Sequence, residues 1–154
     1  MSKMIPQEYK RAARIFEALY FDWQDQLSNN HEAQWWFHTG LFDLLIPDSL
    51  TVLGETEQSK TAGAKRRREH VVPRLAIATR CIEMFKEGKT VDEVAVFLQQ
   101  YLKIVWVSSK ESVAIDLSSL CQKSDMPKEA GKWWLTSESL LIRLKRANVQ
   151  FNPM

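Results

Sequence analysis

β-Branched and aromatic residues fill the segment Lys103-Ile-Val-Trp-Val107, in a chain whose other segments mostly have helical spacing. Such residues favour extended backbone, so this segment is predicted to be a strand. Capping-box spacing occurs on both sides of it, in Thr90-Val-Asp-Glu93 and in Ser108-Ser-Lys-Glu111, and predicts a helix starting at each. A shorter strand is predicted at 67–72. The chain is therefore expected to be α+β and predominantly helical, with a small two- or three-stranded sheet built from residues near 69–72 and 103–107.

Helical periodicity covers most of the remaining chain. Residues 6–27 place apolar side chains at steps of three and four, and Pro6 suits the first turn of that helix. A second helix is predicted from Asn30 to the residues before Pro47, because the residue preceding a proline is pushed out of helical geometry. Further helices are predicted from Pro73 to Gly88, from 90 to 101, from 108 to about 120, and from 138 to 147, where Asn148 closes the last one.

The composition is typical of one globular domain: 154 residues, of which 45% are hydrophobic and 26% charged. We expect an N-terminal helical pair at 1–50, a mobile loop at 54–66, and a C-terminal loop and helix at 121–154. No run approaches the roughly 18 apolar residues that cross a bilayer, so no membrane partner is expected. The N-terminus is not typical of a secretory signal, and Cys81 and Cys121 lack metal-ligand spacing. Two reduced thiols and a cytoplasmic location are predicted.

Charge is distributed unevenly along the chain. Residues 1–50 carry an excess of acids, whereas residues 60–80 carry an excess of bases with Glu69 as the only acid. The bases of this second region are Lys60, Lys65, Arg66, Arg67, Arg68, Arg74 and Arg80. Such an asymmetry indicates either a surface for an anionic partner or a solvated loop. The Glu69-His70 step beside it fits either a metal-dependent phosphodiester site or an ordinary junction between strand and helix.

Two segments, REHVVP at 68–73 and LKIVWVSSKESVAIDL at 102–117, resemble the HNH, or ββα-metal, nuclease pattern. The resemblance implies that His70 is a general base that activates water and that Glu69 is a carboxylate ligand of a divalent cation. It also implies that the basic run contacts phosphates. The predicted binding residues are Lys65, Arg66, Arg67, Arg68 and Arg74.

The chain departs from the HNH pattern at two positions. Lys103 stands where the family has an asparagine, and Ser112 stands where it has a metal-binding histidine. Glu111 or Asp116 could supply an oxygen ligand suited to Mg²⁺, which gives Glu69 and Glu111 as the predicted metal ligands. The resemblance therefore implies a degenerate catalytic centre. No cofactor is expected, and Mg²⁺ only if the site is functional.

The first functional expectation is a nucleic-acid-associated binding protein on an HNH-like scaffold, without nuclease activity, whose partner is the DNA or RNA phosphate backbone. Two alternatives stay open. One is a phage or mobile-element inhibitor or adaptor that binds a protein or ribonucleoprotein host-defence complex, and the other is a weak metal-dependent endonuclease. The pairs Trp35-Trp36 and Trp133-Trp134 are interpreted either as stacking platforms for bases or as core residues.

Overall fold

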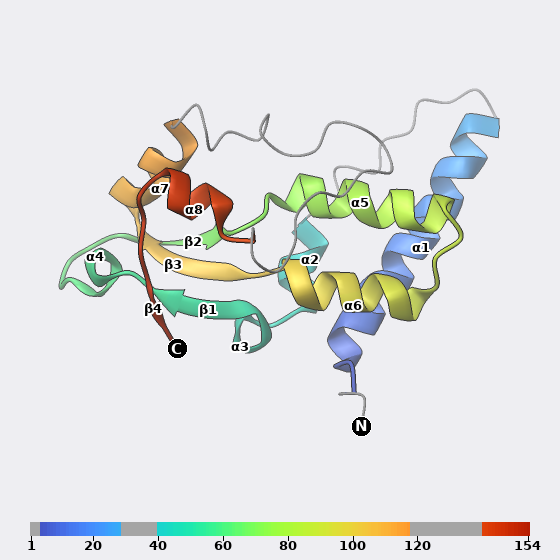
Figure 1. The fold of residues 1–154 in the computed structure, drawn as a ribbon. Coiled ribbons are helices and arrows are strands. Elements are labelled where there is room, and N and C mark those ends of the chain that lie inside the picture. The colour runs from blue at the N-terminus through green and yellow to red at the C-terminus, as the bar shows by residue number, and fades with distance from the viewer. Residues whose placement is uncertain (1–3, 29–39, 118–139) are drawn as a thin grey trace.

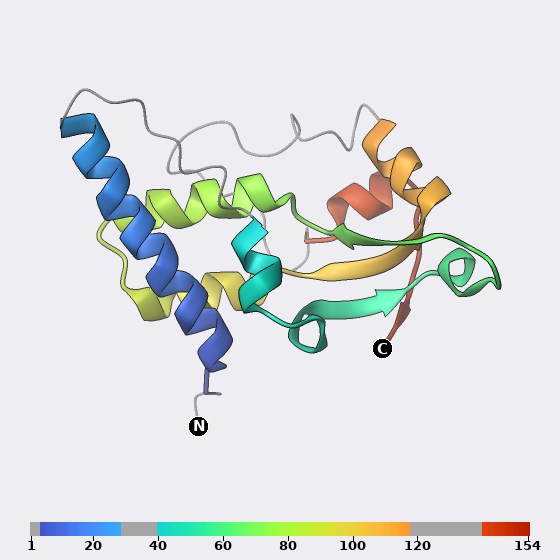
Figure 2. The ribbon, with the colours of Figure 1, turned by 180° about the vertical axis from the view of Figure 1, so that it is seen from behind.

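The computed structural model describes residues 4–28, 40–117 and 140–154, which form a helical group beside a small mixed sheet (Figures 1 and 2). The helices are α1 (Gln7–Ser28), α2 (Leu41–Leu45), α3 (Asp48–Thr51), α4 (Glu57–Lys60), α5 (Arg74–Lys86), α6 (Val91–Tyr101), α7 (Ser109–Leu117) and α8 (Ile142–Arg146). The strands are β1 (Val52–Glu55), β2 (Arg66–His70), β3 (Ile104–Ser108) and β4 (Asn152–Pro153). The α+β class predicted from the sequence is confirmed.

The sheet has the strand order β2-β3-β1-β4. Strand β3 lies in the middle, antiparallel to β2 and parallel to β1, and β4 adds to β1 in the antiparallel sense. The predicted pairing of the two segments near 69 and 105 is confirmed by the register, which places Glu69 opposite Val105. Strands β1 and β4 were not expected, because neither Val52–Glu55 nor Asn152–Pro153 shows the alternation of a strand.

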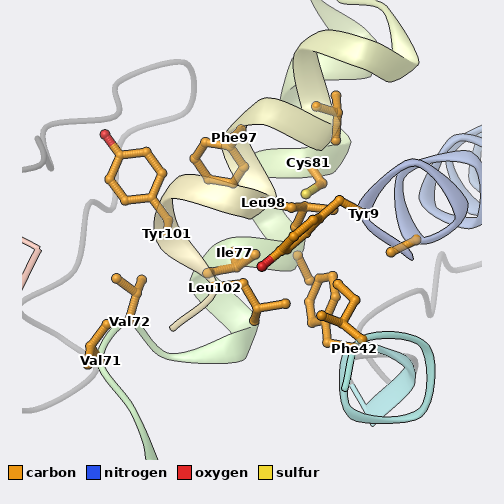
Figure 3. Close-up of a cluster of buried hydrophobic side chains, with 14 of the residues drawn as sticks. Tyr9, Phe42, Val71, Val72, Ile77, Cys81, Phe97, Leu98, Tyr101 and Leu102 are labelled. Carbon is orange, nitrogen blue, oxygen red and sulfur yellow. The ribbon is translucent and has the colours of Figure 1, made fainter. Parts of the chain in front are cut away.

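Helices α1, α5 and α6 pack against one another at one end of the sheet, and α2 packs on α1. Their contact faces form the hydrophobic core, which includes Phe97 and Leu98 of α6 (Figure 3). Tyr9 of α1 is 1% exposed, and its hydroxyl donates a hydrogen bond of 3.1 Å to the Leu50 carbonyl. Burial raises the pKa of this phenol to about 12. At the other end of the sheet, α7 packs on β2 and β3 and contacts α8.

Two predicted helix starts and one predicted helix end are confirmed, but the last helix, predicted from 138, begins at Ile142. Thr90 and Glu93 form a complete capping box at the start of α6. Ser108 and Glu111 form another: the Ser108 hydroxyl accepts from the Glu111 N–H, and the Glu111 carboxylate accepts from the Ser108 N–H. Asn148 ends α8 with a φ of 56°, a left-handed conformation that asparagine tolerates better than most residues.

The segment 54–66, predicted to be a mobile loop, contains regular structure and buried residues. Gly54 belongs to β1, and Thr56 is the buried N-cap of α4, its hydroxyl accepting a hydrogen bond from the Ser59 N–H. The residues of this segment are small and polar, which is typical of a loop. Here, however, Thr56 and Ser59 form hydrogen bonds with each other in the protein interior. In α5, Leu75 is 45% exposed, whereas Ile77 is fully buried.

One glycine is needed where β1 meets β4. A Cβ added at Gly54 would overlap with the carbonyl oxygen of Asn152 and the Phe151 ring, and the former is backbone that cannot rotate away. We expect Gly54→Ala to lower the free energy of unfolding by about 1–3 kcal/mol. Chemical denaturation measures this change, and Gly40→Ala, where the added Cβ meets nothing within 4 Å, is the control. Equal stability of the two variants would contradict the β1–β4 contact.

Candidate functional site

The predicted site residues lie on β2, and the alternation of this strand divides them between two faces of the sheet. Arg66, Arg68 and His70 are opposite Ser108, Trp106 and Ile104 of β3, so they share one face. Arg67 and Glu69 point to the other face, on which α7 packs. Adjacent residues of the basic run therefore belong to different surroundings.

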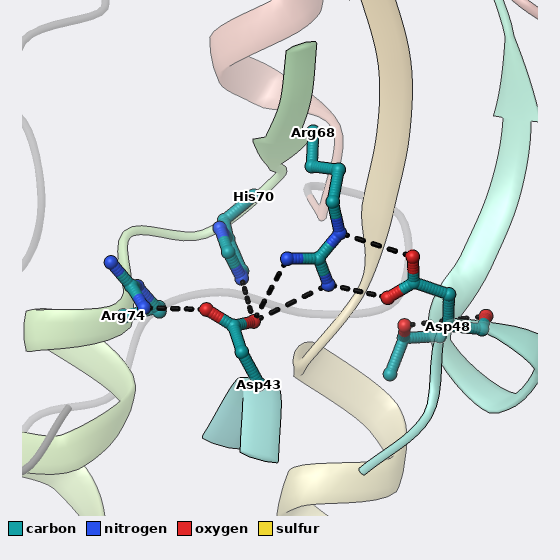
Figure 4. A network of polar contacts seen from close by, with 6 residues as sticks. Asp43, Asp48, Arg68, His70 and Arg74 are labelled. Atoms are coloured by element: carbon teal, nitrogen blue, oxygen red, sulfur yellow. Dashed lines mark hydrogen bonds and ion pairs between the residues drawn. The ribbon is translucent and has the colours of Figure 1, made fainter. Parts of the chain in front are cut away.

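On the first face, the Asp43 carboxylate of α2 is shared by three side chains (Figure 4). Arg74 donates to it at 2.5 Å, Arg68 lies 3.3 Å away, and His70 Nε2 lies 3.3 Å away. Arg68 also donates from two nitrogens to the Asp48 carboxylate, at 2.5 and 3.1 Å. This group, called the Asp43 network below, joins α2 and α3 to β2 and to the start of α5.

His70 is largely enclosed, with 15% of its side chain exposed. Burial lowers the pKa of its imidazole; the Asp43 carboxylate opposes this effect, and the Arg74 and Arg68 guanidiniums add to it. The neutral imidazole that donates from Nε2 to Asp43 keeps Nδ1 as an acceptor. The side chain is therefore chemically able to accept a proton, which is what the predicted role as a base requires. That role stays a prediction.

On the second face, Glu69 contacts Ser112 and Arg143. The Ser112 hydroxyl donates to the Glu69 carboxylate at 3.2 Å, and an Arg143 nitrogen lies 3.4 Å from the same carboxylate. Burial raises the pKa of Glu69, and the Arg143 guanidinium opposes that shift. Arg143 is only 5% exposed, and it also donates at 2.8 Å to the His70 carbonyl and lies 3.7 Å from Asp116.

A pocket of about 260 Å³ lies at the His70 end of β2. Both faces of the strand contribute to its wall, which is lined by Arg68, Glu69, His70, Pro73, Arg74, Leu75, Asp116 and Arg143. Guanidinium groups are the most frequent charged groups of this lining, and each of them is paired with at least one carboxylate. The pocket is therefore polar and nearly balanced in charge.

The remaining basic residues differ in how they are partnered. Arg66 donates to Glu55 at 2.9 Å, and its guanidinium lies 4.6 Å from the centre of the Trp106 ring. The side chains of Lys65 and Arg67 are exposed and have no hydrogen bond or ion pair within the described part of the chain. Of the five predicted binding residues, these two are the ones whose charge is available to a partner.

The predicted metal ligands do not fit a cation well. Glu111 accepts hydrogen bonds from the Ser108 N–H at 2.9 Å and the Thr56 hydroxyl at 2.5 Å, so it caps α7 and contacts the N-cap of α4. Glu69 is paired with Arg143, whose charge disfavours a second cation beside it. In residues 4–28, 40–117 and 140–154 no three histidine, cysteine, aspartate or glutamate side chains are grouped as a metal site.

Sequence reasoning missed three residues of this site: Asp43, Asp48 and Arg143. The signal for the two aspartates was present, because residues 1–50 have excess acid and residues 60–80 excess base. Those excesses were interpreted separately, whereas Arg68 pairs with both aspartates. Arg143 lies in the last turn of α8, where a cation suits the helix dipole, but its side chain points inward to β2. The tryptophan pairs and Cys121 lie outside the described residues.

No family model, no curated protein and no solved structure matches this chain. The likeness to HNH nucleases therefore depends on the short motifs alone. None of the described helices is long and apolar enough to span a bilayer.

The Asp43 network yields a stability prediction. Asp43→Asn removes the negative charge shared by Arg68, Arg74 and His70, and we expect the free energy of unfolding to fall by about 1–3 kcal/mol. The pKa of His70 should fall further, because the Asp43 charge raises it. Chemical denaturation and an NMR titration of the imidazole measure the two effects.

The control for this substitution is Asp92→Asn. Asp92 is 67% exposed and pairs with Lys10 at 3.6 Å, so its loss should change stability by no more than about 0.5 kcal/mol. An Asp43 variant as stable as the Asp92 variant, with an unchanged His70 titration, would contradict the network.

The lowered pKa of His70 leads us to predict that the free energy of unfolding depends on pH. Its folded pKa lies below the ordinary value of 6.5, so the unfolded chain takes up the proton first as the pH falls. The stabilising contribution is complete above pH 6.5 and is lost as the pH falls toward the folded pKa. We expect the free energy of unfolding of the native protein to decrease more between neutral and mildly acidic pH than that of His70→Gln. Denaturation at several pH values measures both proteins. If their free energies of unfolding fall equally with pH, His70 does not contribute to the pH dependence of stability.

Proposed function

We propose that this protein binds nucleic acid through the phosphate backbone and does not cleave it. The observation that carries the proposal is that Lys65 and Arg67 are exposed and unpaired within the described residues. Arg67 lies on β2, and Lys65 immediately precedes that strand. Exposed cations of this kind provide the sequence-independent attraction that phosphates require.

The internal pairs restrict which residues can take part. Arg66 and Arg68 are held by Glu55, Asp48 and Asp43, so a phosphate would have to displace a carboxylate to reach them. Arg74 is 37% exposed and has one carboxylate partner, Asp43. The proposed contact residues are therefore Lys65 and Arg67.

The scaffold gives secondary support. Strands β2 and β3 are antiparallel, and α7 follows β3 directly, which agrees with the strand–strand–helix order implied by the HNH resemblance. Helices α5 and α6 are inserted between the two strands. We propose binding without cleavage because Ser112 donates to Glu69 where the family has a metal-binding histidine, and because Arg143 pairs with the same carboxylate. A cytoplasmic location is part of the proposal, since the buried Cys81 is a free thiol.

Salt dependence tests the proposal. Binding of fluorescent duplex and single-stranded oligonucleotides should weaken steeply as NaCl rises from about 50 to 200 mM, because bound cations release counterions. In Lys65→Ala/Arg67→Ala, affinity should fall about tenfold, and the slope of log affinity against log salt should be less steep by about one to two. Fluorescence anisotropy measures both quantities.

The matched control is Lys86→Ala/Lys89→Ala, which removes the same charge from exposed positions at the end of α5. It should retain the affinity and slope of the native protein. Equal losses in the two double variants would indicate a general charge effect and would count against a β2 site. No binding by the native protein at low salt would refute the proposal.

A further inference from the structure

The two edge strands of the sheet, β4 and β2, differ in the backbone groups that another strand could pair with. Strand β4 at one edge consists of Asn152 and Pro153, and proline has no N–H to donate. Strand β2 at the other edge extends over Arg66–His70 and pairs only with β3 among the described strands. An unpaired edge of this kind presents peptide groups to any extended chain that can approach it.

The hydrogen bonds at the two ends of β2 show which of its peptide groups point toward β3 and which point away from it. The Ser109 N–H donates to the Lys65 carbonyl at 2.9 Å, and the Val71 N–H donates to the Lys103 carbonyl at 3.0 Å. In an antiparallel ladder, alternate residues bond to the neighbouring strand, so the odd-numbered residues of β2 bond to β3. The N–H and C=O groups of Arg66 and Arg68 therefore point away from the sheet. The His70 carbonyl agrees with this phase, since it accepts from Arg143 rather than from β3.

Side-chain charge is uneven across this edge. On the face of Arg66 and Arg68, the guanidiniums are balanced by Glu55 and Asp48. On the other face, Arg67 is exposed and unpaired within the described residues, and Lys65 continues the ladder on the same side. A second copy of β2 would place cation against cation, so self-pairing is disfavoured.

We propose that the β2 edge binds an acidic, extended segment of a partner protein as an added strand. The backbone of that segment would bond to the peptide groups of Arg66 and Arg68, and its acidic side chains, at every second position, would face Lys65 and Arg67. Nucleic acid has no row of peptide groups and cannot form this ladder. The proposal goes beyond phosphate binding and does not depend on it, although the two ligands would compete for Lys65 and Arg67.

The probe is a short blocked peptide of alternating glutamate and threonine, whose binding to the full chain is measured by calorimetry. Two further peptides carry N-methyl groups, either on every glutamate or on every threonine. In an added strand, alternate residues direct their peptide groups to β2, so one methylated peptide should lose at least about tenfold in affinity and the other should retain it. Loss with methylated threonine indicates an antiparallel strand, and loss with methylated glutamate a parallel one.

Two comparisons complete the test. A peptide of alternating lysine and threonine should not bind, and Lys65→Ala/Arg67→Ala should weaken the acidic peptide about tenfold while Lys86→Ala/Lys89→Ala does not. The proposal is overturned if the acidic peptide does not bind, or if both methylated peptides behave alike. Oligonucleotide binding is measured separately, so phosphate binding and strand addition can each fail without the other.

Discussion

The Asp43 carboxylate is the contact on which the arrangement of the site depends. It lies on a helix of only one and a half turns, yet it contacts a strand residue, Arg68, a strand-end residue, His70, and the first residue of α5, Arg74. One acidic side chain thereby holds together elements that are far apart in the sequence. Because these groups are only partly exposed, their attraction is less screened than that of a surface pair. The position of His70 follows from this contact.

Pairing with carboxylates also determines how much of the basic run at 65–68 is exposed as positive charge. A block of consecutive arginines suggests one continuous cationic surface, but a strand sends successive side chains to opposite faces. Arg66 and Arg68 are neutralised by acids from other elements, while Arg67 stays exposed. What the run offers a partner is therefore a narrow row of charge along a sheet edge. This geometry suits extended ligands, whether a phosphate backbone or a strand.

Much of the local structure could be predicted from the sequence. The two capping boxes, the strand near 103–107 and the helix end at Asn148 were all predicted, because each depends on residues within a few positions of one another. The segment 54–66 was not, since burial of Thr56 and Ser59 depends on β3 and α7 closing over them. The role of Arg143 could not be predicted either, because its partners Glu69 and His70 lie about half the chain away.

The sequence by itself determined the α+β class, the ends of several helices and the pairing of the segments around Glu69 and Val105. These follow from periodicity and capping, which act over short distances along the chain. Only the tertiary structure decided which charges are free. A carboxylate neutralises an arginine beside it even when the two residues are far apart in the sequence. Packing of the core is what brings such residues together in space. Among the residues that the structure describes, folding therefore left Lys65 and Arg67 without an acidic partner and placed Arg68, Arg74 and Arg143 beside carboxylates.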